Sequence, residues 1–142
     1  MITLAQAQTI ISTALAHARR EKLKALAVIV LDAGAHSIAF AREDGAPLYR
    51  FEIAKAKAAG ALGMGADTRH IAERAKGNPL FYQGVAAIVG GQIAFSPGGV
   101  LVRNAAGTVV GAVGVSGDTG DMDEACAVAG IVAAGVHHGV TA

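Results

Sequence analysis

Residues 26–41, LAVIVLDAGAHSIAFA, carry the clearest structural signal in the chain. Two runs rich in Val, Ile and Ala, residues 26–31 and 37–41, flank the segment DAGAH at residues 32–36. Aspartate and glycine favour tight turns, and a connection of this length is common in β-hairpins. The stretch therefore predicts two antiparallel strands joined by a turn.

Helical patterns lie on both sides of this hairpin. Before it, apolar residues recur at helical spacing over residues 4–18, and Thr3 is suited to cap that helix. After it, Pro47 is suited to the first turn of an alanine-rich helix that ends near Leu62. A short helix is predicted to follow over residues 68–75.

The glycine-rich remainder predicts a three-stranded meander followed by a helix. Its three strands are to come from four β-type runs, residues 85–89, 93–95, 100–102 and 109–115, which are separated by turns rich in small and turn-forming residues. The last helix is predicted to begin near Asp121, with Glu124 as a capping-box partner, and to continue to about His137.

The order of these elements predicts the fold class. A helix, two strands, two helices, three strands and a final helix indicate an α/β (α+β) fold, with helices packed on an antiparallel sheet. A chain of 142 residues suits one domain, residues 1–142.

Composition and charge argue against a nucleic-acid partner. The chain has no Trp, few other aromatic residues and a formal net charge of +1. All its Lys and Arg residues lie at or before Arg103, but they do not form the tight basic cluster that binds a phosphate backbone. We therefore expect no nucleic-acid binding.

Cysteine usage and hydropathy indicate a cytoplasmic protein. Cys126 is the only cysteine, so the chain forms no intrachain disulfide, and its apolar surroundings favour a buried thiol. The longest apolar run, residues 125–136, is shorter than the roughly 18–20 residues of a membrane helix. We expect no membrane partner.

Four groups of residues, in this order and spacing, resemble one known family. They are residues 30–34 with 38–46, the helix pattern Ala54-x-x-Lys57-Ala58-x-x-Ala61, the glycine-rich segments 98–100 and 107–117, and residues 123–130. Together they resemble the GlcG/HbpS family (DUF336), which is similar to the C-terminal domain of PduO-type corrinoid adenosyltransferases. The chain departs from the family at Gly60, where threonine is usual, and at His137-His138.

The resemblance implies a profilin-like, three-layer α/β/α fold with a five-stranded antiparallel sheet, assembled into homo-oligomers. Family members include haem-binding and haem-degrading proteins, and others are encoded near genes of glycolate or aromatic catabolism. A small-molecule ligand, haem or a related tetrapyrrole, is therefore one hypothesis. An enzyme or accessory protein of organic-acid or aromatic catabolism is the second, and a non-catalytic interaction module is the third.

Haem binding requires an axial ligand, usually an imidazole, and an apolar slot. His17 borders the apolar face of the first helix and resembles the proposed axial ligand of the corrinoid-enzyme relatives. A histidine at the boundary between core and solvent is the competing interpretation. Met64 and Met122 are possible soft ligands, whereas His36 and His70 are expected to face solvent.

Glycines and a serine near the final helix are candidate cofactor-binding residues. Gly98, Gly99 and Ser116 lie in segments whose backbone amides are able to approach an anionic ligand. Tight turns are the competing explanation for these glycines.

Lys57 is the leading candidate for catalysis, because it matches the family's recurrent lysine on an alanine-rich helix. A desolvated lysine has a lowered pKa, which suits acid–base or carbonyl chemistry. Arg42 and Asp123 would line the same pocket. The alternative is a lysine whose ammonium group reaches solvent.

Overall fold

A computed structural model describes residues 1–141 of the chain. The predicted hairpin is present in it and forms half of the sheet. β1 (Ala27–Asp32) pairs with β2 (Ser37–Arg42), and β3 (Gly99–Arg103) pairs with β4 (Val109–Ser116). β4 also pairs with β1, so the antiparallel sheet has the order β2-β1-β4-β3.

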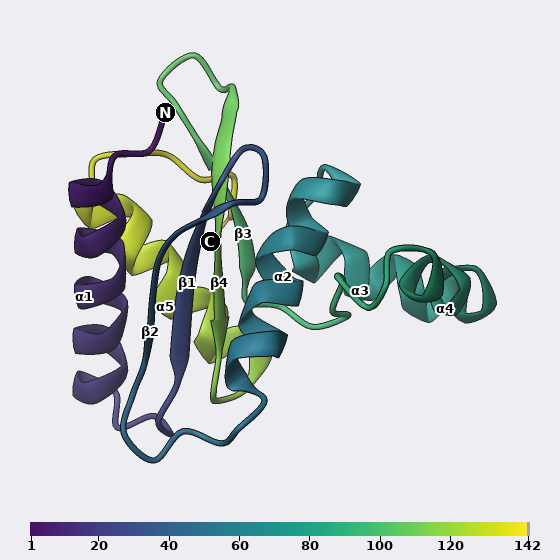
Figure 1. Cartoon of the computed structure of the whole chain (residues 1–142), viewed down its shortest axis with the longest axis horizontal. Coiled ribbons are helices and arrows are strands. Elements are labelled where there is room, and N and C mark those ends of the chain that lie inside the picture. Colours follow the sequence, from purple (N-terminus) through teal and green to yellow (C-terminus); the bar gives the residue numbers. More distant parts are fainter. Residues whose placement is uncertain (142) are drawn as a thin grey trace.

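Helices cover both faces of the sheet (Figure 1). α1 (Leu4–Arg20) and α5 (Gly120–Ala133) lie on one face, and α2 (Arg50–Met64) lies on the other. The strands alternate accordingly: Val28 and Val30 of β1 pack towards α1 and α5, whereas Ile29 and Leu31 pack towards α2. The expected three layers are therefore present.

The α2 backbone lies very close to the sheet because glycines face it. A Cβ atom on Gly114 would lie 2.0 Å from the carbonyl oxygen of Ala54, and one on Gly99 would lie 2.3 Å from that of Lys57. Alanines on the facing side of α2, such as Ala58, complete the contact. The small residues thus bring α2 into backbone contact with β3 and β4.

Two further helices, α3 (Thr68–Gly77) and α4 (Pro79–Ile88), extend away from the sheet as an arm (Figure 1). A small apolar cluster of Ile71, Tyr82 and Ile93 joins this arm to the segment that follows it. Met64, at the end of α2, packs against the same cluster.

The prediction of five strands is wrong, because the sheet has four. Residues 85–88 belong to α4, which Pro79 begins and which Gly90, with φ of 62°, helps to end. Residues 93–95 form no strand, and Ile93 instead packs against α2 at Gly60. A five-residue apolar run fits a strand and a buried helix turn equally well.

The ends of two helices also differ from the prediction. α2 begins at Arg50, after a turn at Pro47, and α5 ends at Ala133. The cap of α5 is Thr119, whose hydroxyl accepts from the Met122 amide, so Glu124 is not a capping-box partner. Within residues 1–141, no helix is both long enough and apolar enough to span a membrane.

The single cysteine is buried, as predicted. Cys126 is on α5 and faces the sheet core. Burial raises the pKa of its thiol to about 12, so the reactive thiolate form is suppressed at neutral pH.

Candidate functional site

Lys57 and Asp123, two of the predicted site residues, form a buried ion pair. Lys57 lies in the middle of α2 and Asp123 in the first turn of α5. The Lys57 Nζ atom is 3.0 Å from Oδ2 of Asp123 and donates a 2.9 Å hydrogen bond to the Val115 carbonyl. The two side chains are 3% and 1% exposed, so the pair joins α2, β4 and α5 away from water.

The pair is stabilised by further hydrogen bonds to the aspartate. Asp123 accepts from the backbone amide of Asp118 at 2.9 Å and from that of Gly117 at 3.4 Å. Burial lowers the pKa of Lys57 and raises the pKa of Asp123, while the attraction between the two charges opposes both shifts. This network holds the turn before α5 against the middle of α2.

Gly98, Gly99 and Ser116 surround the same pair. A Cβ on Gly98 would lie 2.8 Å from Nζ of Lys57, so only glycine leaves room for the ammonium group. The amide of Gly99 donates to Thr68, and the buried Ser116 hydroxyl accepts from the Arg50 guanidinium at 3.0 Å. Five of the predicted site residues therefore gather in one place.

This cluster is closed rather than open to a ligand. Its residues are buried, and the main cavities of residues 1–141 are lined by other side chains. A catalytic lysine must touch its substrate. The geometry therefore gives Lys57 a structural role, and its reaction with a carbonyl compound stays a prediction.

Neither Arg42 nor His17 forms a hydrogen bond or an ion pair with a side chain of this cluster within residues 1–141. Arg42, at the end of the outer strand β2, donates to the carbonyl of Ala46 at 3.1 Å. His17 is half-buried in the last turn of α1, on the opposite face of the sheet from Lys57. The predicted axial ligand and the predicted cofactor glycines are thus not brought together within one chain.

The remaining histidines are spread over the molecule. His36 lies 3.3 Å from the Asp32 carboxylate on the exposed hairpin turn, and His70 is exposed on α3. His137 lies beyond α5 and pairs through its backbone with Arg103, while His138 accepts from the Val140 amide. Residues 1–141 contain no cluster of three or more His, Cys, Asp or Glu side chains placed to hold a metal ion.

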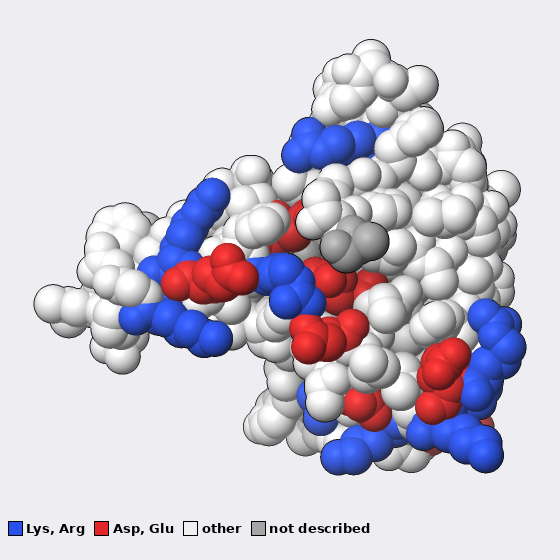
Figure 2. Space-filling view, turned by 180° about the vertical axis from the view of Figure 1, so that it is seen from behind, with Lys and Arg blue, Asp and Glu red and all other residues white. Residues whose placement is uncertain are grey.

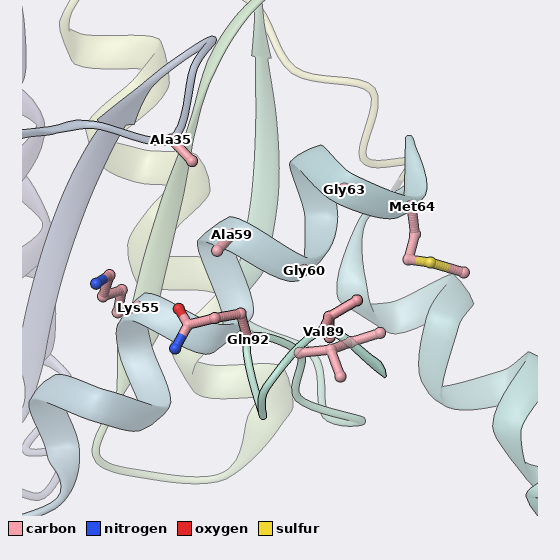
Figure 3. Close-up of a pocket in the computed structure, with 9 residues that line it drawn as sticks. Ala35, Lys55, Ala59, Gly60, Gly63, Met64, Val89 and Gln92 are labelled. Carbon is pink, nitrogen blue, oxygen red and sulfur yellow. The ribbon is translucent and has the colours of Figure 1, made fainter. Parts of the chain in front are cut away.

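A groove of about 430 Å³ runs along the outer side of α2 (Figure 3). Its lining residues come from α2, from the β1–β2 turn and from the segment after α4: Lys55, Ala59, Gly60, Gly63, Met64, Ala35, Val89, Gln92 and Ile93. Most of them are apolar and small, so the floor of the groove is the α2 backbone itself.

The two ends of the groove differ in chemistry. Lys55 lies towards one end of α2 and Met64 at the other, about 14 Å apart along the helix axis. Between them, Ile93 packs tightly on Gly60, where a Cβ would lie 3.0 Å from the Ile93 backbone. The absence of a side chain at Gly60 therefore lets the segment after α4 lie against α2 and form one wall of the groove.

The groove residues fit a flat apolar ligand that carries acidic groups. A thioether is one of the side-chain groups that hold haem iron, and Met64 supplies it. Lys55 is half-buried, and its ammonium group is suited to pair with a carboxylate at the other end. Asp and Glu side chains are absent from the groove lining.

Sequence reasoning missed the groove because residues 85–89 and 93–95 were expected to form strands. Met64 is the signal available in the sequence, because a methionine is a possible soft ligand. Met122, the other candidate methionine, is 40% exposed on α5 and packs outside the groove.

Comparison with known proteins adds a family match. A family model described as "haem degrading protein HbpS-like" matches residues 2–132, nearly the whole chain. No curated protein is similar enough to match.

Several solved structures have a similar fold. The complex of PduOC with heme is 23% identical with a TM-score of 0.85, and 95% of this chain aligns with 96% of that one. HbpS is 30% identical with a TM-score of 0.79, covering 92% of this chain and 87% of HbpS. Protein ORFY of Klebsiella pneumoniae, from the DUF336 family, is 28% identical with a TM-score of 0.86, covering 94% and 90%.

Proposed function

Because the chain belongs to the HbpS-like family, we propose that it binds haem or a related tetrapyrrole in the groove along α2. The observation that carries this proposal is the groove itself, a largely apolar groove of about 430 Å³ that Met64 and Lys55 line with a thioether and an ammonium group. The family description and the heme complex of PduOC suggest the ligand.

The groove residues have distinct roles in this proposal. Ala59 and Gly63 present a flat floor against which a macrocycle packs, because neither side chain projects far from α2. Lys55 would pair with a propionate, and the Met64 thioether would hold the iron. Bound haem would supply a metal centre for ligand or electron chemistry, while the chain excludes water from one face of the ring.

His17 is the alternative axial ligand. Its imidazole is half-buried at the end of α1, and it lines none of the main cavities of residues 1–141. A haem held by His17 would need a second surface, such as another copy of the chain, to cover its other face. The two sites lie on opposite faces of the sheet, so one experiment distinguishes them.

We predict that haemin added to the purified protein shifts its Soret absorption band and saturates at one equivalent per chain. Met64→Leu conserves side-chain volume and removes the ligand atom, so it should weaken haemin binding about tenfold or more and change the ligand-sensitive visible bands. Met122→Leu is the matched control and should behave as the wild type.

The results for these variants distinguish Met64 from His17 as the residue that binds the iron. If His17→Ala loses the Soret shift while Met64→Leu still shows the wild-type shift, the haemin-binding site is at α1 and not in the groove. A wild-type protein that gives no specific Soret shift would overturn the proposed function.

We also propose that the chain forms homo-oligomers through the α3–α4 arm. Leu80 and Ile88 on α4 are 81% and 84% exposed, and Leu48 and Tyr49, before α2, form a second exposed apolar patch. Such exposed apolar surfaces favour association with another copy of the chain, because contact between two of them removes apolar surface from water.

Ile88→Lys tests the assembly without disturbing the core, because the side chain it replaces is almost fully exposed. We expect its mass in solution, measured by light scattering, to fall to that of a single chain, while the wild type is larger. Lys76→Gln, also on the arm, should leave the mass unchanged. A monomeric wild type at tens of micromolar would refute the assembly.

Catalysis of organic-acid or aromatic breakdown by Lys57, Arg42 and Asp123 stays a prediction, as does a cytoplasmic location. The closed cluster around Lys57 favours ligand binding over catalysis as the function of the chain.

A further inference from the structure

A second cavity, of about 250 Å³, lies between the start of α3 and the edge strand β3. It is lined by Gly65, Ala66, Asp67, His70, Arg74, Leu101, Arg103 and Gly139. Unlike the groove along α2, it is rich in nitrogen-bearing side chains. Figure 2 shows Lys and Arg side chains on the arm, with an acidic side chain among them, and further basic side chains near the loop between β3 and β4; acidic side chains also lie at the base of the arm.

The fold places two arginines on opposite sides of this cavity. His70 and Arg74 are one turn apart on α3, so both lie on the side of the helix that lines the cavity. Arg103 comes from the end of β3. Two guanidinium groups from different elements therefore face one space.

These guanidinium groups have unused donors. Arg103 makes one hydrogen bond of 3.1 Å, to the carbonyl of Gly107, and neither Arg74 nor Arg103 forms an ion pair within residues 1–141. Arg69, in contrast, is held by Glu124 and Asp121, which raise the pKa of its guanidinium. Within the described part of the chain, the two arginines of the cavity therefore keep guanidinium donors for a ligand.

Asp67 is the acidic residue that lines the cavity, and its carboxylate is hydrogen-bonded to the backbone of β3. Its Oδ1 atom accepts a 2.8 Å hydrogen bond from the Leu101 amide, and the residue is 8% exposed. Its side chain makes no capping bond to α3, and its backbone carbonyl accepts from the His70 and Ile71 amides. Two arginines against one carboxylate leave the cavity positively charged.

We propose that this cavity binds a short dicarboxylate, with one carboxylate on Arg74 and the other on Arg103. Arginine binds carboxylates through two parallel hydrogen bonds, which suits planar anions better than single point charges. The cavity volume of about 250 Å³ leaves room for a dicarboxylate with a chain of about four carbons. This site is separate from the haem groove and does not depend on it.

Calorimetric titration with succinate tests the proposal, with uncharged succinamide and inorganic phosphate as comparison probes. We expect succinate to bind with a dissociation constant in the millimolar range or below, phosphate at least tenfold more weakly, and succinamide not at all. Absence of succinate binding, or equal binding of succinamide, would overturn the site. Phosphate binding as tight as succinate would overturn the dicarboxylate assignment.

Three variants test whether succinate binds in this cavity. Arg74→Gln and Arg103→Gln should each weaken succinate binding at least tenfold, because each removes one of the two charged contacts. Lys76→Gln removes a positive charge from the same helix outside the cavity and should bind as the wild type. Arg74 is exposed, so its variant should fold normally. Equal weakening in all three variants would show general charge attraction and contradict the proposal.

Discussion

Lys57→Ala is expected to lower the free energy of unfolding by about 3–5 kcal/mol. The substitution leaves the Asp123 carboxylate, 1% exposed, without its charged partner, and it also removes a donor from the Val115 carbonyl. An uncompensated buried charge is far more costly than a complete pair, so the loss should be large. Urea denaturation followed by circular dichroism measures it.

Two controls show whether the loss comes from the ion pair. Lys57→Met combined with Asp123→Leu replaces the pair by apolar side chains and should recover most of the lost stability. Lys55→Ala, two residues earlier on α2, removes a half-buried lysine that forms no ion pair within residues 1–141, and it should change stability by less than about 0.5 kcal/mol. A Lys57→Ala variant as stable as the wild type would contradict the structural role.

Gly114→Ala is expected to cost about 3 kcal/mol or to prevent folding. The new Cβ would lie 2.0 Å from the carbonyl oxygen of Ala54, and the obstacle is backbone rather than a movable side-chain end. α2 would have to move away from β4, which also opens the packing around Lys57. Thermal unfolding and soluble yield both report the effect.

Gly84→Ala is the matched control for this substitution. Gly84 lies inside α4, and a Cβ there meets no atom within 4 Å. Alanine favours the helix over glycine, so this variant should gain up to about 1 kcal/mol. Equal stability of the two variants would show that α2 does not lie as close to the sheet as described.

Local patterns predicted most of the fold. Residues 26–41 predict the hairpin, because two strand-type runs lie on either side of a turn-forming segment. Thr3 caps α1 as expected. The second hairpin, β3 with β4, was also predicted from its valine runs and glycine turns. These elements are determined by short-range chemistry, which is visible in a single sequence.

The arm could not be predicted in the same way. The run at residues 85–89 is apolar throughout, so it lacks the periodicity that separates helix from strand. Its helical form depends on Pro79 at the start, two glycines at the end and the packing of Tyr82 on Ile71. That last contact is tertiary, and the sequence does not display it.

The candidate site was predicted in part. Lys57, Asp123, Gly98, Gly99 and Ser116 do lie together, but they form a closed network. The sequence could not reveal that burial, because it depends on how close α2 lies to β3 and β4. The groove along α2 was hidden by the wrong strand assignment, since Val89, Gln92 and Ile93 form its other wall.

Amide NMR spectra recorded with and without haemin test the central claim, that the groove along α2 holds a tetrapyrrole. Ferric haem is paramagnetic and broadens the signals of amides close to it. The account predicts that the amide signals of Ala59, Gly63 and Gln92 disappear at one equivalent, while those around His17 persist. Spectra that do not change, or losses confined to α1, would contradict it.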